Sequence, residues 1–154
     1  MTTPPAAIYV HRFAFPPTAE DENHHVNNVE YVRKLQEAAI AHTRHNGWSP
    51  EELHQHGWTW VVRSHHIEYL QPCRANQDIA LLTWVANFKK IRSLRKYQFI
   101  RLADRAILAN AQTDWIFLDA HRNRPIRIPP QVLAAYVIVT DAHAAHYATQ
   151  ICDT

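Results

Sequence analysis

The sequence is poor in glycine, in cysteine and in net charge. It contains only two glycines, Gly47 and Gly57, which excludes the glycine-rich phosphate loops of the Walker and Rossmann types. Its two cysteines, Cys73 and Cys152, form neither a disulfide framework nor a metal-type spacing, so they fit a reducing cytoplasm, although one disulfide between them stays open. The formal net charge of +2 does not by itself argue for nucleic-acid binding.

Long apolar runs are also missing from the sequence. No stretch is long and apolar enough to span a bilayer, and residues 1–5 lack the basic segment and apolar run of a signal peptide. We therefore expect a cytoplasmic protein with neither a membrane nor a nucleic-acid partner. Apolar residues still make up 47% of the 154 residues, which indicates a single folded domain over residues 1–154 with a sizeable core.

The first half of the sequence predicts a strand followed by two helices. Residues 6–15 have the composition of a strand, and a proline pair ends it. Apolar residues recur at helical spacing over about 28–46. Asn27 is the expected cap of this helix, with Glu30 bonding back to it, and Gly47 suits the left-handed position after its end. A short second helix then begins at a Ser-Pro cap and ends at the second glycine.

The second half predicts four strands and, after them, a short helical run to about Tyr136. The strands are rich in aliphatic and aromatic residues and cover residues 58–70, 78–90, 93–102 and 105–118. The short links between them imply an antiparallel sheet. One long amphipathic helix needs one sheet to cover it, so we expect an α+β domain with the sheet wrapped around the helix. We place the core at about residues 6–136 and assign no structure to residues 137–154.

The sheet face turned away from the helix should also carry apolar side chains. Candidates for this face are some of the aromatic residues Trp84, Phe88, Tyr97 and Trp115. An exposed apolar face of this kind indicates association with a second copy of the chain.

Residues 21–31, Asp-Glu-Asn-His-His-Val-Asn-Asn-Val-Glu-Tyr, place an acid and a polar loop directly before the long helix. The first N–H groups of a helix lack acceptors within it, and the helix dipole adds partial positive charge there. A carboxylate is ionised at neutral pH and can attack a carbonyl or deprotonate water, while the helix start holds the oxyanion. The alternative is that Asp21 is a solvated loop acid and that Asn27 and Asn28 only form caps and turns.

With these residues, the sequence resembles the hot-dog-fold acyl-CoA thioesterases of the 4-hydroxybenzoyl-CoA thioesterase type over roughly residues 6–136. The segment that starts at Asp21 is similar to the family's Asp-x-x-x-His-Val-Asn-Asn-x-x-Tyr pattern. Ile67-Glu-Tyr-Leu-Gln-Pro72 resembles its Tyr-x-x-Pro strand end, and a third similarity covers 113–119 and 124–130. The Asn-Asn segment also resembles plant acyl-carrier-protein thioesterases, which share the fold.

Two positions depart from the family's pattern. Ala19 stands where the family often has a second aspartate, and His24 stands where it often has glycine.

The resemblance implies a hot-dog fold and hydrolysis of an acyl-CoA or aroyl-CoA thioester to a free acid and coenzyme A. It implies no metal and no bound cofactor, since coenzyme A is part of the substrate. Asp21 would be nucleophile or general base, and the N–H near Asn28 would be the oxyanion donor. His25 would orient Asp21 or stabilise the loop, and Asn27 and Tyr31 would contact the substrate. The family's homodimers carry their active sites at the subunit interface, and many members form tetramers.

A basic hairpin between the second and third of the predicted strands contains Lys89, Lys90, Arg92 and Ser93. Under the resemblance, this hairpin would bind the phosphates of coenzyme A. A solvated turn that discourages edge pairing explains the same residues equally well.

The adjacent histidines do not predict a metal site, because zinc needs three or four ligands and neighbouring residues of a strand face opposite ways.

An acyl-carrier-protein thioesterase and a non-catalytic domain that binds acyl-CoA or a protein remain the alternatives to an acyl-CoA thioesterase.

Overall fold

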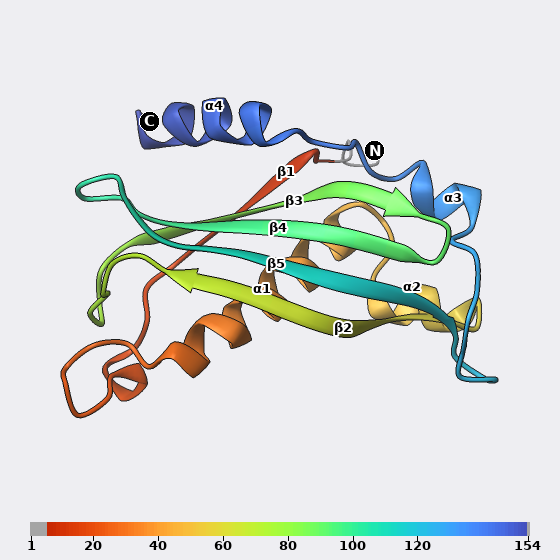
Figure 1. Cartoon of the computed structure of the whole chain (residues 1–154), viewed down its shortest axis with the longest axis horizontal. Helices are drawn as coiled ribbons and strands as arrows, with labels where there is room; N and C mark the ends of the chain where they lie inside the picture. The colour runs from red at the N-terminus through yellow and green to blue at the C-terminus, as the bar shows by residue number, and fades with distance from the viewer. Residues whose placement is uncertain (1–5, 154) are drawn as a thin grey trace.

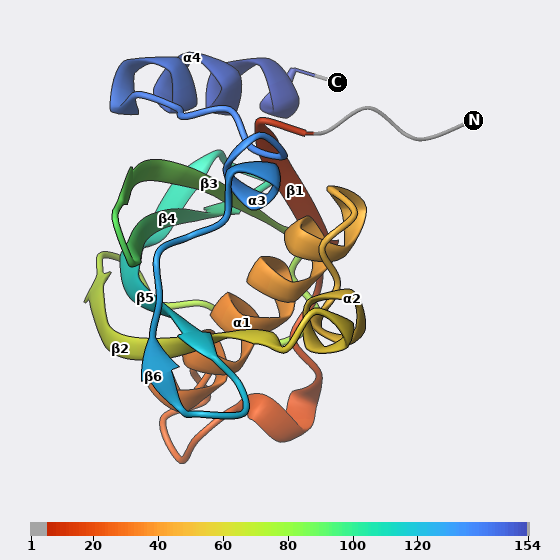
Figure 2. The ribbon, with the colours of Figure 1, turned by 90° about the vertical axis from the view of Figure 1, so that its right-hand side faces the viewer.

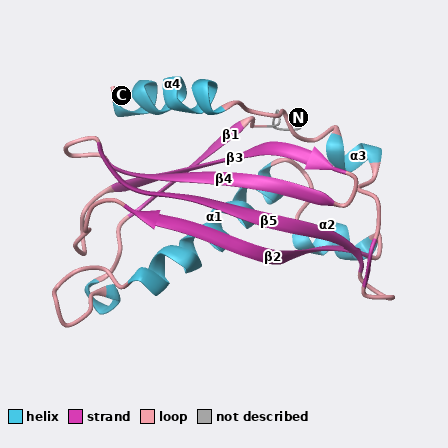
Figure 3. Ribbon diagram, in the orientation of Figure 1, coloured by secondary structure: helices cyan, strands magenta, loops and turns pink. Residues whose placement is uncertain are grey.

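The computed structural model describes residues 6–153 of the chain. Residues 1–5, on which the signal-peptide argument rests, and residue 154 lie outside the described part. Figure 3 distinguishes helices from strands, and Figure 1 labels them. In chain order the elements are β1 (Ile8–Phe13), the 3-10 helix η1 (Pro17–Ala19), α1 (Asn28–His45), α2 (Pro50–Gln55), β2 (Trp58–Tyr69), β3 (Ile79–Lys89), β4 (Arg92–Arg101), β5 (Ala106–Asp119), β6 (Arg124–Pro125), α3 (Pro130–Leu133) and α4 (Asp141–Cys152).

The strands form one antiparallel sheet in the order β1-β3-β4-β5-β2, with the short β6 paired to β5. Register shifts at Val62/Ser64 in β2 and at Val85/Asn87 in β3 mark bulges, which bend a strand and increase its twist. The sheet curls around α1, as the end-on view in Figure 2 shows. The predicted α+β hot-dog fold, an antiparallel sheet wrapped around one long central helix, is therefore confirmed.

The core lies between α1 and the concave face of the sheet. One face of α1 is buried, and the inward side chains of β3, β4 and β5 pack against it. The largest members of this cluster are Phe15, Tyr31, Leu35, Ile79, Leu81, Tyr97, Phe99 and Leu108. Because side chains alternate across a strand, the neighbouring residues of β3 and β4 point to the opposite, convex face.

The cap of α1 is only partly as predicted. Asn27 Oδ1 accepts the Val29 N–H at 3.0 Å, which confirms Asn27 as the N-cap. Glu30 does not bond back to Asn27, because the Asn27 N–H donates to the Ala19 carbonyl at 2.9 Å. Glu30 instead lies 3.8 Å from Arg33. The predicted capping box was therefore wrong, because the backbone N–H that Glu30 would have accepted is hydrogen-bonded to the preceding loop.

The convex face of the sheet is covered by α4, which occupies the segment left unassigned from sequence (Figure 1). Ala144, Ala148 and Ile151 of α4 pack on a cluster that includes Leu82 and Trp84 of β3. The helix is capped by its preceding threonine, whose Oγ1 accepts a backbone N–H at 3.1 Å.

Of the four aromatic residues considered for the convex face, only Trp84 lies there. Tyr97 belongs to the core cluster under α1, while Phe88 and Trp115 line a cavity beside α1. The apolar surface that indicated a second copy is thus covered in part by the chain's own C-terminal helix. No helix in residues 6–153 is long and apolar enough to cross a membrane.

Candidate functional site

A pocket of about 270 Å³ opens where the loop before α1 meets the end of β2. We call it the helix-start pocket. Three segments contribute its walls: the loop that begins at Asp21, the first turn of α1, and the chain that leaves β2. Its lining residues are Asp21, His25, Val26, Asn28, Tyr31, Tyr69, Leu70, Gln71, Pro72 and Cys73.

Asp21 is exposed and anchors a tight turn through its own backbone and side chain. Its Oδ1 accepts the N–H of Asn23 at 2.9 Å and that of His25 at 3.4 Å, and its carbonyl accepts the His24 N–H at 3.0 Å. Within residues 6–153, its Oδ2 has no hydrogen-bond partner, which leaves one carboxylate oxygen for chemistry.

His24 has a φ of 60°, the left-handed conformation that glycine adopts most easily. The turn therefore keeps the backbone shape that the family's glycine would favour, and the side chain of His24 is exposed.

The start of α1 presents an unpaired donor to the helix-start pocket. The N–H groups of Val29 and Glu30 are taken by the side chain and carbonyl of Asn27. The Asn28 N–H, first in the helix, has no acceptor within the described part of the chain. The Tyr69 hydroxyl donates to the Asn28 carbonyl at 3.0 Å, so the end of β2 holds the helix start in place.

His25 and Tyr31 have mainly structural contacts. The His25 backbone exchanges hydrogen bonds with Asp21, but the structure gives its imidazole no bond to that carboxylate among residues 6–153. His25 thus fits the loop-stabilising alternative better than the orienting one. Tyr31 is buried and meets Tyr69 edge to face, with ring centroids 5.2 Å apart. Burial raises the pKa of Tyr31, so its hydroxyl stays neutral as it lines the pocket.

Cys73 is a second nucleophile type in the helix-start pocket, but its environment disfavours attack. The acceptors available to its S–H are the Arg74 carbonyl, 3.3 Å from Sγ, and Gln77 Oε1, 3.6 Å from Sγ. Burial raises the pKa of Cys73 to about 11, and the charge of Arg101 offsets this only in part. Since the thiolate is the reactive form, this environment disfavours attack by Cys73 at neutral pH.

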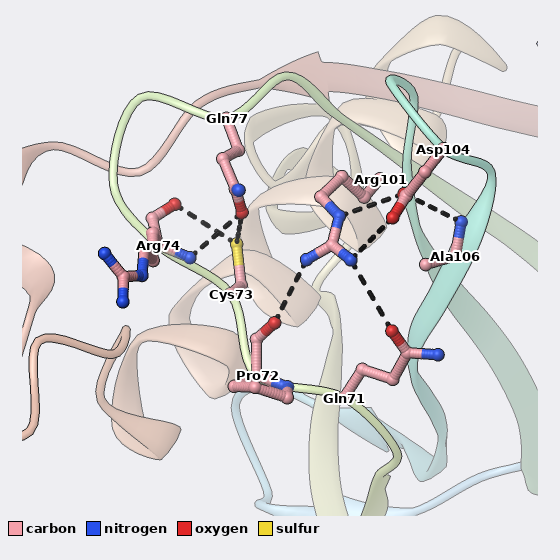
Figure 4. A network of polar contacts seen from close by, with 8 residues as sticks. All are labelled: Gln71, Pro72, Cys73, Arg74, Gln77, Arg101, Asp104 and Ala106. Atoms are coloured by element: carbon pink, nitrogen blue, oxygen red, sulfur yellow. Dashed lines mark hydrogen bonds and ion pairs between the residues drawn. The ribbon is translucent and has the colours of Figure 1, made fainter.

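Arg101 braces the wall of the pocket that follows β2 (Figure 4). Its Nη1 donates to the Pro72 carbonyl at 3.2 Å, and its Nη2 lies 3.5 Å from Gln71 Oε1. Asp104 holds the guanidinium from the other side: its Oδ1 accepts from Arg101 Nε at 3.0 Å and its Oδ2 from Arg101 Nη2 at 2.8 Å. This ion pair holds the pKa of Asp104 at about 2, chiefly through the Arg101 hydrogen bonds.

Sequence reasoning missed several residues of this site. Tyr69 had a signal, because the Tyr-x-x-Pro end of β2 was recognised although no role was given to it. No feature of the sequence pointed to Arg101, because it lies 29 residues after Pro72 and reaches the Pro72 carbonyl only through the register of the sheet.

The basic hairpin lies away from the helix-start pocket of its own chain. Arg101, at one end of β4, touches the pocket wall, whereas Arg92 begins β4 at the other end, about 30 Å away at strand rise. Figure 1 shows the β3–β4 hairpin and the start of α1 at opposite ends of the molecule. Lys89 and Lys90 are exposed, and Arg92 forms an ion pair with Asp114 at 2.7 Å. Ser93 is buried and lines a second cavity, between α1 and the sheet. One chain therefore does not bring these four residues together with Asp21.

Asn27, for which a substrate contact was expected, does not line the helix-start pocket, and its side chain is engaged in the helix cap. Among residues 6–153 there is no group of three or more His, Cys, Asp or Glu side chains placed to hold a metal ion.

Comparison with known proteins identifies a family for this arrangement. Residues 15–136 match the family described as the thioesterase-like superfamily. No curated protein matches the sequence.

Solved structures share the fold at low sequence identity. An acyl-ACP thioesterase from Bacteroides thetaiotaomicron superposes with a TM-score of 0.79 at 19% identity, covering 88% of this chain and 54% of that one. This chain therefore spans about half of that relative. A Staphylococcus aureus protein in complex with CoA gives 0.78 at 14% identity, with 92% and 84% covered. A 1,4-dihydroxy-2-naphthoyl-CoA thioesterase from Synechocystis gives 0.77 at 14%, with 88% and 98% covered.

Proposed function

Because the chain belongs to the thioesterase-like superfamily, we propose that it hydrolyses an acyl-CoA or aroyl-CoA thioester to a free acid and coenzyme A. One observation carries this proposal: a free carboxylate oxygen of Asp21 and the unpaired N–H of Asn28 belong to the same pocket. The resident thiol, Cys73, is held protonated, and no other activated nucleophile lines that pocket. The complex of a structural neighbour with CoA is consistent with this class of ligand.

The proposed chemistry uses the two groups in sequence. Asp21 either attacks the thioester carbon, forming an anhydride that water then cleaves, or removes a proton from a water that attacks directly. In both routes, the carbonyl oxygen becomes negatively charged and accepts the Asn28 N–H. The positive end of the α1 dipole adds to this stabilisation. Collapse of this tetrahedral species breaks the C–S bond and expels coenzyme A as a thiolate. In the general-base route the thiolate takes the proton that Asp21 removed from water, and in the anhydride route, where this collapse forms the anhydride, it takes a proton from solvent water.

The test is the substitution Asp21→Asn. The amide oxygen of Asn can still accept the Asn23 N–H, so the turn should persist while the negative charge is lost. We expect kcat for release of free thiol from acyl-CoA substrates to fall by about 10²–10⁴. The matched control is Glu22→Gln, which removes a neighbouring exposed acid and should leave kcat within a factor of about two. Equal rates for Asp21→Asn and wild type would remove Asp21 from the mechanism.

Two further measurements separate this function from its alternatives. Turnover of one acyl chain on coenzyme A and on acyl carrier protein compares the two carriers directly, and we expect the coenzyme A thioester to be preferred. Saturable binding of acyl-CoA with no release of thiol across short, long and aromatic acyl groups would instead leave a binding domain.

We also propose that the active form is a dimer joined at β2. Among residues 6–153 this strand pairs with β5 on one side only, and most of its residues are exposed, so its other edge is open to a further strand. If two β2 strands paired antiparallel about a two-fold axis, the C-terminal end of β2 in one copy would lie beside the N-terminal end of β2 in the other. The basic hairpin of one copy would then lie near the helix-start pocket of the other, where it could contact the phosphates of coenzyme A.

A further inference from the structure

A second cavity, of about 280 Å³, lies between the C-terminal half of α1 and the concave face of the sheet. We call it the Arg95 cavity. Aromatic and aliphatic side chains dominate its walls, among them Ile40, Trp60, Phe88 and Trp115. It starts beside Gln36, about 7.5 Å along α1 from Tyr31, the last residue of that helix in the helix-start pocket, at the rise of a helix.

The charged residue of this cavity is Arg95, whose side chain is only 5% exposed. Its Nη1 donates to His42 Nδ1 at 2.9 Å and to Thr83 Oγ1 at 3.0 Å. No other hydrogen bond engages the guanidinium within residues 6–153, so its Nη2 and Nε donors stay available to the cavity.

The groups that face Arg95 are all neutral. Burial, followed by the charge of Arg95 itself, lowers the pKa of His42 to about 3, and His42 Nε2 donates its proton to the Ala6 carbonyl at 2.6 Å. Burial raises the pKa of Tyr97 and of Tyr136, and the charge of Arg95 offsets this only in part. None of the ion pairs formed among the described residues includes Arg95.

The ring of Trp115 lines the same cavity, whereas its indole N–H is buried against the Tyr97 hydroxyl and is not a donor to the cavity. The cavity therefore offers one charged donor group, and none of the residues that line it is a carboxylate. An unpaired charge is costly to bury.

We propose that the Arg95 cavity binds a small apolar carboxylate. Its two oxygens would take the free edge of the guanidinium, which matches a carboxylate in bidentate geometry, and its hydrocarbon body would lie among the aromatic side chains. A cavity of about 150 Å³ admits benzene, so 280 Å³ accommodates a bicyclic aromatic or a medium-length acyl group. The carboxylate is either a free acid or the distal carboxyl of an acyl group; the second source rests on the proposed function.

The opposite interpretation, a purely structural arginine, does not account for the arrangement. A structural arginine in a core is expected to pair with a carboxylate. Even Arg92, whose side chain is 43% exposed, pairs with Asp114 at 2.7 Å. Arg95 has two neutral partners, and its remaining donors border open space lined by apolar groups.

The test compares matched acids and amides by isothermal titration calorimetry. We expect the wild-type protein to bind 2-naphthoate and octanoate at least tenfold more tightly than 2-naphthamide and octanamide. Arg95→Met should weaken carboxylate binding by about 10- to 100-fold and abolish the preference over the amide. The control Arg12→Met removes an exposed arginine of β1 and should bind as wild type does. Equal affinity for acid and amide, or carboxylate binding that survives Arg95→Met, would overturn the proposal.

A readout on the wild-type protein keeps the test independent of how the variant folds. The side-chain indole signal of Trp115, whose ring lines the cavity, should shift in a nitrogen–proton correlation spectrum when 2-naphthoate is added, and should shift far less with 2-naphthamide at the same sub-saturating concentration. No shift with the acid would overturn the proposal even if Arg95→Met is unfolded.

A kinetic arm separates the two sources of the carboxylate. If the acyl group supplies it, wild-type kcat/KM should be about tenfold higher for an ω-carboxyacyl-CoA than for the unsubstituted acyl-CoA of equal length, and Arg95→Met should lose this preference. Equal kcat/KM values, with retained binding of free acids, assign the cavity to a free acid. Absence of any thiol release alongside intact carboxylate binding would reject the proposed hydrolysis and leave this site standing.

Discussion

At the scale of single residues, the proposed chemistry depends on one backbone N–H. Asn28 is the first residue of α1, and the preceding Asn27 has φ −62° and ψ 138°, a conformation that tolerates a following proline. Proline is also favoured at the first helical position, where its missing N–H breaks no helical bond. Position 28 therefore allows the donor to be removed without breaking the helix.

We predict that Asn28→Pro lowers kcat by about 10²–10³, the usual cost of losing one oxyanion donor. Asn28→Ala retains the N–H and measures the contribution of the side chain alone, so its loss should be at least tenfold smaller. Steady-state thiol release and circular dichroism of both variants give the comparison. If the two substitutions reduce kcat equally, the backbone N–H is not the donor.

His42 makes stability depend on pH. Its folded pKa is about 3 against an ordinary 6.5, because burial and the charge of Arg95 disfavour the protonated ring. The unfolded chain therefore binds a proton at this residue below pH 6.5 while the folded chain does not. The contribution of His42 is fully present above pH 6.5 and is lost as the pH falls towards 3.

We expect the free energy of unfolding to fall by about 1.4 kcal/mol per pH unit from this one group across that window. Urea titrations between pH 7 and pH 4 should show a flatter profile for His42→Gln than for wild type. His54→Gln, which removes an exposed histidine of α2, should leave the slope unchanged. A slope that is the same in all three proteins would show that His42 does not govern the effect.

At the scale of elements, α4 is separated from the helix-start pocket by the sheet. It packs on the convex face over Trp84, whereas the pocket is built from the start of α1 and the end of β2. The two should consequently respond to different substitutions.

We predict that Ala148→Glu destabilises the fold by at least about 1–3 kcal/mol, since it places a charge in a contact that is 9% exposed. Ala142→Glu introduces the same side chain at an exposed position of α4 and should have little effect. Thermal unfolding measures both variants. At a temperature where each is folded, kcat should match wild type; a loss of kcat in folded Ala148→Glu would contradict the separation of the two faces.

At the scale of the whole molecule, the basic hairpin and the helix-start pocket can meet only between two copies. We predict a solution mass of twice the 17.9 kDa of the chain, or a multiple of it, by sedimentation. Lys89→Glu with Lys90→Glu should raise KM for an acyl-CoA at least several-fold but leave an acyl-pantetheine, which lacks the nucleotide phosphates, nearly unaffected. A monomer, or equal effects on both substrates, would contradict this arrangement.

Mixed dimers test which copy supplies the hairpin. A heterodimer of the Asp21→Asn chain with the chain carrying both lysine substitutions contains one fully intact site if the hairpin acts across the interface. Activity towards acyl-CoA should then recover above the sum of the two parents. Without recovery after subunit exchange, the hairpin acts within its own chain or not at all.

Local interactions account for what could be predicted from the sequence. The cap of α1 by Asn27, the turn at Gly47 and the aliphatic and aromatic composition of β3 to β5 all involve residues a few positions apart, which is why the boundaries of these elements were predicted closely. The order of acid, loop and helix around Asp21 is also set by residues that are close together in sequence. The segments at the centre of the candidate site could therefore be identified without coordinates.

Only the tertiary structure decided which distant residues meet. The register of β4 carries Arg101 to the pocket wall at one end and Arg95 into the inner cavity, and nothing near either residue in sequence indicates its destination. The docking of α4 over Trp84 likewise depended on long-range burial, because a short amphipathic segment gains its stability from the surface that it covers. Local preference thus determined the elements and the reactive turn, while sheet register and packing determined what surrounds them.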